Sequence, residues 1–131
     1  MKNEFVPYGL AVKLKEKGFN EPCFMVYHEK KFVAITSHQE SNFPIPTTTN
    51  KALGSKTFTA PLYQQVVEWL RIKHKIYVWA QLKGNSFKQK YTPCVMENLN
   101  PNKTSEYYTD SETPTEALVS AIEVALKLIP A

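Results

Sequence analysis

The chain has 131 residues, of which 43% are hydrophobic, a length and composition that predict one compact domain. Its formal net charge of +4 favours polyanionic over polycationic partners, although such a mild excess is common among soluble proteins. Arg71 is the one arginine among sixteen basic residues, and proteins that read nucleic-acid sequence rely on the arginine fork, so sequence-specific recognition is disfavoured.

The first third of the chain predicts a helix followed by a hairpin. Residues 7–17 place apolar side chains on one helical stripe, and Gly18 suits the left-handed position that ends a helix. Residues 23–27 and 32–36 are rich in β-branched and aromatic side chains and flank a charged turn, as in a β-hairpin. Residues 37–58 are polar, with two prolines and no clear period, and predict a long loop that is mobile or functional.

A second helix is expected from a cap at Thr59 to about His74. Lys73, His74 and Lys75 fall in its last turn, where the helix dipole favours positive charge by roughly 0.3–1 kcal/mol each, so no ligand is needed to explain them. The apolar side chains recur at helical spacing and form the expected buried stripe: Leu62, Val66, Trp69 and Leu70.

The last part of the chain predicts three strands and a helix. Residues 76–82 read as a strand, 83–86 as a turn, 87–99 as the returning strand and 105–109 as a third strand. The capping box Thr113-Pro114-Thr115-Glu116 then opens a C-terminal helix. The order α-ββ-α-βββ-α predicts an α+β fold in which three helices cover a largely antiparallel sheet of about five strands.

The residues that usually carry catalysis or metal binding are scattered along the sequence. His28, His38 and His74 lie in different predicted elements, and no spacing brings two of them together, so no metal site is expected. No glycine-rich phosphate loop is present, and we expect no cofactor. An enzyme would need Glu68 to work with a loop histidine such as His38, and the sequence does not favour this hypothesis.

One zone of the sequence combines cations with aromatic rings and holds no acidic residue, as single-strand nucleic-acid binders do. In the strand 76–82, Tyr77 and Trp79 share one face, so their rings are either exposed for stacking or covered by a helix. Three helices for so small a sheet favour burial of Trp79. The candidate nucleic-acid-binding residues are Lys73, Lys75, Tyr77, Trp79, Lys83, Lys88 and Lys90.

Three blocks of the sequence resemble a family of small proteins of gut Bacteroidales and their phages. They are "EFVPYGLAVKLKEKGFNEPCF", "TAPLYQQVVEWLRIKHKIYV" and "TPTEALVSAIEVALKLI". The resemblance as a whole extends over about two thirds of the chain. The chain differs from the usual family pattern in its long 37–58 loop and in "RIKH" where "REKH" is common. The resemblance implies a phage or mobile-element origin and an α+β fold, and it carries no known activity or catalytic residues.

The sequence therefore leaves two functions open. The first is a non-enzymatic phage or prophage accessory protein that binds an unknown protein partner. The alternative is a weak, sequence-nonspecific binder of single-stranded nucleic acid through the lysine and aromatic surface. Cys23 and Cys94 lack the spacing of a disulfide or zinc framework, and no apolar run approaches a membrane span, so we expect free thiols, no membrane association and a cytoplasmic location.

Overall fold

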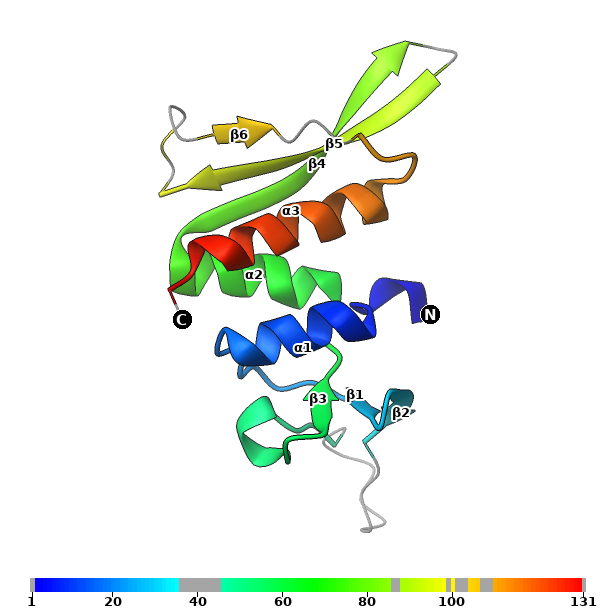
Figure 1. Cartoon of the computed structure of the whole chain (residues 1–131), viewed down its shortest axis with the longest axis vertical. Helices are drawn as coiled ribbons and strands as arrows, with labels where there is room; N and C mark the ends of the chain where they lie inside the picture. Colours follow the sequence, from blue (N-terminus) through cyan, green and yellow to red (C-terminus); the bar gives the residue numbers. More distant parts are fainter. Residues whose placement is uncertain are drawn as a thin grey trace. The chain divides into compact units, whose positions relative to one another are not determined.

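The computed structural model describes residues 2–35, 46–85, 88–98, 100, 104–106 and 110–130. Within them the chain forms two short 3-10 helices (η), three α-helices and six strands (Figure 1). In chain order these elements are η1 Lys2–Glu4, α1 Tyr8–Glu16, β1 Met25–His28, β2 Lys31–Ala34, η2 Asn50–Ala52, β3 Thr57–Thr59, α2 Tyr63–His74, β4 Ile76–Asn85, β5 Lys88–Glu97, β6 Thr104–Glu106 and α3 Pro114–Leu128.

The predicted α+β class is confirmed, with one additional strand and a second sheet. The strands form two antiparallel sheets in the orders β2-β1-β3 and β4-β5-β6. The strand that the sequence did not indicate is β3, whose three residues are too few to show a period. The chain divides into two compact units at residues 65 and 66, each described by itself below. The expectation of a single domain stays a prediction.

The hairpin predicted in the first unit is confirmed as β1 and β2. His28 pairs with Lys31, so Glu29 and Lys30 form a two-residue turn, and both have positive φ values of 50° and 68°. Such a turn matches the twist of a hairpin, but Asn and Gly are the residues that adopt it at low cost. The β1–β2 turn is therefore a strained feature of this unit.

The described part of the 37–58 segment contains two short elements of regular structure. Residues 36–45 lie outside the described residues, so the predicted loop can be assessed over 46–58 alone, and these residues contain η2 and β3. The buried Asn50 donates from Nδ2 to the Phe19 carbonyl at 2.8 Å and accepts the Thr59 N–H at Oδ1 at 2.9 Å. One side chain thus ties η2 both to the segment after α1 and to β3.

The predicted first helix and its end at Gly18 are confirmed. Gly18 has a φ of 91°, and the Phe19 N–H bonds back to the Leu14 carbonyl at 2.9 Å, which closes the last turn of α1. Leu10 and Leu14 are buried. Aromatic rings packed edge to face or tilted against one another account for much of the remaining interior of this unit: Phe5, Tyr8, Tyr27, Phe32 and Phe58.

The predicted cap of α2 at Thr59 is wrong. Thr59 belongs to β3, and α2 begins four residues later at Tyr63. Gln65 supplies the cap instead, because its Oε1 accepts the Leu62 N–H at 3.0 Å. The helix ends at His74 as expected, and Lys75 follows it with a φ of 57°.

The second unit contains most of α2, a long hairpin and α3. β4 and β5 pair over ten residues each, whereas β6 pairs with β5 at Cys94–Met96 alone. Residues 83–85, expected in a turn, lie within β4, and the expected strand 105–109 is seen as Thr104–Glu106, with 107–109 outside the described residues. α3 contacts β4 and β5 (Figure 1). Its N-cap is confirmed, since Thr113 Oγ1 accepts the Glu116 N–H at 3.1 Å.

Candidate functional site

The register of the β4–β5 hairpin brings five of the seven candidate residues to one face. Directly opposed residues of an antiparallel pair point to the same side of the sheet. We call the side that carries Tyr77 the outer face. The opposed pairs on it are Tyr77 with Met96, Trp79 with Cys94, Gln81 with Thr92, Lys83 with Lys90 and Asn85 with Lys88.

Each face of the hairpin has buried residues, and exposure varies along each face. On the opposite, inner face Ile76 and Val78 are about 5% exposed and Val95 is fully buried, which indicates that α3 packs on this side. On the outer face Thr92 and Cys94 are buried, whereas Tyr77 and Trp79 are half-buried. The sequence favoured burial of Trp79, but Trp79 is half-buried and lies on the face opposite the one assigned to α3, so both rings keep some accessible surface.

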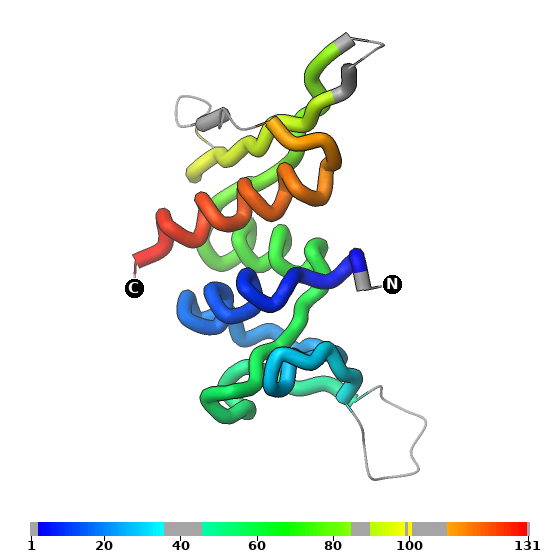
Figure 2. The backbone as a smooth tube through the Cα atoms, turned by 45° about the vertical axis from the view of Figure 1, so that its right-hand side comes forward, coloured from blue at the N-terminus to red at the C-terminus, as the bar shows by residue number. Residues whose placement is uncertain are grey.

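The end of the hairpin, residues 82–85 and 88–90, extends past β6 and past the bridge between Tyr91 and Ser111, in the segment that leads into α3 (Figure 1, Figure 2). Lys83 is exposed and lies directly opposite Lys90, an arrangement of like charges that costs stability in a sheet. Leu82, on the inner face, is 56% exposed because the hairpin has left the helix behind at this point. The hairpin end therefore presents lysines on one face and an apolar side chain on the other.

Acidic groups border the outer face on the β6 side. Thr92 Oγ1 donates to Asp110 Oδ1 at 2.7 Å, and Glu106 lies opposite Cys94 in the register. Cys94 is covered in part by Gln81, whose Oε1 accepts from the thiol at 3.8 Å. The positive charge of the outer face is consequently concentrated at the hairpin end.

Lys73 and Lys75 do not join this cluster. Both are exposed, but Lys75 precedes β4, about 25 Å from Lys83 at roughly 3.3 Å per strand residue. Their position at the end of α2 is explained by the helix dipole, as the sequence indicated. The candidate cations thus lie at opposite ends of the β4–β5 hairpin.

The residues considered for catalysis do not come together in the described part of the chain. Glu68 is exposed and lies 3.6 Å from the Arg71 guanidinium, one turn along α2. His74 packs against Trp69, and burial lowers its pKa. His28 hydrogen-bonds Thr57 at 2.8 Å, and His38 lies outside the described residues. Among the described residues no group of three potential metal ligands is found.

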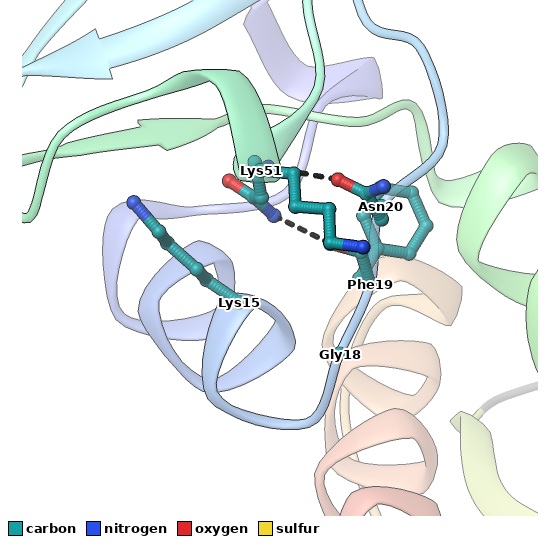
Figure 3. A pocket seen from close by; sticks show the side chains of 6 residues that line it. Lys15, Gly18, Phe19, Asn20 and Lys51 are labelled. Atoms are coloured by element: carbon teal, nitrogen blue, oxygen red, sulfur yellow. Dashed lines mark hydrogen bonds between the residues drawn. The ribbon is translucent and has the colours of Figure 1, made fainter.

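A depression of about 320 Å³ in the first unit lies beside Gly18 (Figure 3). Its polar groups are mostly engaged in bonds that hold the fold. The Lys15 ammonium donates to the Gly54 and Thr57 carbonyls at 2.7 and 2.8 Å, and Asn20 Oδ1 accepts the Lys51 N–H. With Asn50 bonded as described above, this depression serves mainly to anchor η2.

Comparison of the chain with protein-family models, curated proteins and solved structures gives no match. The resemblance to proteins of gut Bacteroidales and their phages therefore stays a prediction. No helix in the described ranges has both the length and the apolar character needed to cross a bilayer. The function must be argued from the hairpin itself.

Proposed function

We propose that this protein acts by binding rather than catalysis, and that its ligand is single-stranded nucleic acid held weakly and without sequence preference. The observation that carries the proposal is the register of β4 and β5. It puts Tyr77 and Trp79 on the same face as Lys83, Lys88 and Lys90. Phosphates would meet the lysines at the hairpin end while bases stack on the two rings.

The chemistry of this face fits a sequence-tolerant ligand. Base stacking on aromatic side chains contributes roughly 1–3 kcal/mol per base and tolerates any base. Lysine ammonium groups attract phosphates as point charges and do not read base edges as arginine does. Like charges at Lys83 and Lys90 repel one another, and a phosphate between them would relieve that repulsion.

A protein partner is the second candidate, and one observation favours it. Leu82 is 56% exposed at the hairpin end, on the face opposite the lysines and next to the half-buried Tyr91. Apolar and aromatic side chains of this kind are frequent at the centre of protein interfaces. The accessory, protein-binding role expected from the sequence would use this inner face of the hairpin end.

The proposal is tested by fluorescence titration with single-stranded DNA and RNA in a Trp69→Phe background, so that Trp79 alone reports. Quenching of Trp79 fluorescence is expected on binding. The logarithm of the association constant should fall with the logarithm of the salt concentration with a slope of about −2, because each of three lysines that neutralises a phosphate contributes about −0.7. The Lys83→Glu, Lys88→Glu double variant should bind at least tenfold more weakly and flatten that slope.

The matched control changes two lysines of the first unit, Lys31→Glu and Lys51→Glu, which alters the net charge equally and should retain the salt slope of the parent. If neither nucleic acid changes Trp79 emission at low salt, the nucleic-acid proposal is wrong. Equal weakening by the control and the hairpin variant would mean that net charge, not the outer face, holds the ligand.

A further inference from the structure

A second depression in the first unit has a different composition from the one beside Gly18. It measures about 330 Å³, within the lower range of small-molecule sites, and lies between α1, the β1–β2 turn and the segment that leads into β3. Its lining combines two aromatic rings with charged and hydroxyl side chains: Tyr8, Glu29, Lys30, Ser55, Lys56 and Phe58.

The two rings form a platform that is fixed from behind. Tyr8 and Phe58 meet edge to face with centroids 5.8 Å apart, and Tyr8 also packs edge to face against the buried Tyr27. The Lys15 ammonium lies 5.1 Å from the Phe58 centroid and is held there by two backbone carbonyls. Both rings remain half-buried, so part of their surface is open to a ligand that stacks or packs edge-on.

The rim of the depression is charged and strained. Lys30 and Lys56 are exposed and exceed the single acid, Glu29, so an anion is favoured. Glu29 and Lys30 are also the two residues with positive φ in the β1–β2 turn. Asn and Gly adopt this backbone conformation at a lower cost in free energy. A turn without positive φ at Glu29 and Lys30 would make the hairpin more stable. The strain at the edge of this cavity therefore motivates a functional interpretation.

We propose that this depression binds a small anion of the nucleoside monophosphate class, with its planar base against Tyr8 and Phe58 and its phosphate between Lys30 and Lys56. The site lies wholly in the first unit and does not depend on the outer face of the β4–β5 hairpin. The strained turn places Lys30 at the rim, and the rings supply the apolar contact area that a free phosphate would not use.

The test is a titration of the whole ¹⁵N-labelled protein with adenosine monophosphate, followed by amide shifts, with adenosine and inorganic phosphate as partial probes. Shifts are expected around Tyr8, Lys30 and Phe58, and each partial probe should bind at least tenfold more weakly than the monophosphate. Shifts confined to the β4–β5 hairpin, or equal affinity for phosphate alone, would overturn the proposal.

Two variants separate a binding role of the rim from a structural one. Lys56→Glu should weaken monophosphate binding at least tenfold, while Lys31→Glu, an exposed lysine next to the turn but outside the depression, should change it less than twofold. The Glu29→Asn, Lys30→Gly double variant should raise Tm by relaxing the turn and still weaken binding at least fivefold. A raised Tm with unchanged affinity would show that the turn has no part in the site.

Discussion

Asn50 and Thr59 are joined by a buried hydrogen bond, in which the Asn50 Oδ1 accepts the Thr59 N–H at 2.9 Å. The same amide donates to the Phe19 carbonyl at 2.8 Å. Because one side chain satisfies a donor and an acceptor from two distant segments, it replaces part of the backbone pairing that a longer β3 would provide. The order of the 46–58 segment depends on this residue.

Replacing Asn50 with Ala should destabilise the protein by about 2–3 kcal/mol, since the Thr59 N–H and the Phe19 carbonyl would lose their partner in a buried place. Urea denaturation monitored by circular dichroism measures the change. Asn20→Ala is the matched control, because the exposed Asn20 caps a single exposed N–H of Lys51 and should cost less than about 1 kcal/mol. Equal effects of the two variants would contradict the bridging role of Asn50.

The conformation of Lys75 predicts a stabilising substitution. Lys75 follows α2 with a φ of 57°, a region where glycine carries no side-chain penalty. Lys75→Gly should therefore raise the free energy of unfolding by up to about 1 kcal/mol, whereas Lys73→Gly, inside the last turn of α2, should lower it by a similar amount. Thermal unfolding of both variants checks the opposite signs, and a loss of stability on Lys75→Gly would contradict this account.

How much of the fold follows from sequence depends on how local each signal is. The end of α1 at Gly18 and the cap at Thr113 need only neighbouring residues, and both were predicted correctly. Thr59 satisfies the chemistry of a helix cap and of a strand equally well, and its tertiary partners, Val26 in β1 and the side chain of Asn50, favour the strand. The Gln65 cap was missed because the signal sought was a serine or threonine at the cap position.

In the candidate site, too, local patterns predicted some features and tertiary contacts determined the others. The alternation along β4 was enough to place Tyr77 and Trp79 on one face. Their partial exposure depends on where α3 packs and on how far β6 extends, which no local pattern encodes. The depression lined by Tyr8 and Phe58 could not be predicted, because it unites three segments that lie far apart in the sequence.

Removing the N-cap of α3 should destabilise the protein. Thr113 Oγ1 accepts the Glu116 N–H, one of the four N–H groups that a helix start leaves without a partner. Thr113→Ala should lower the free energy of unfolding by about 1 kcal/mol, while Thr115→Ala, an exposed change within the first turn, should stay within about 0.5 kcal/mol of the parent. Chemical denaturation compares the pair, and an unchanged midpoint for Thr113→Ala would argue against the cap.

Burial of the Cys23 thiol predicts slow alkylation and a loss of stability at alkaline pH. Desolvation raises the pKa of Cys23 from its ordinary value of 9.0 to about 11. Thiolate is the reactive form, so in a Cys94→Ala background iodoacetamide at pH 8 should modify the folded protein about 100-fold more slowly than the unfolded chain. Because the folded pKa is raised, the associated stability is present below pH 9 and is lost as pH rises toward 11. A Cys23→Ala variant in the same background should show a smaller loss of stability over that range, and rapid alkylation of folded Cys23 would contradict its burial.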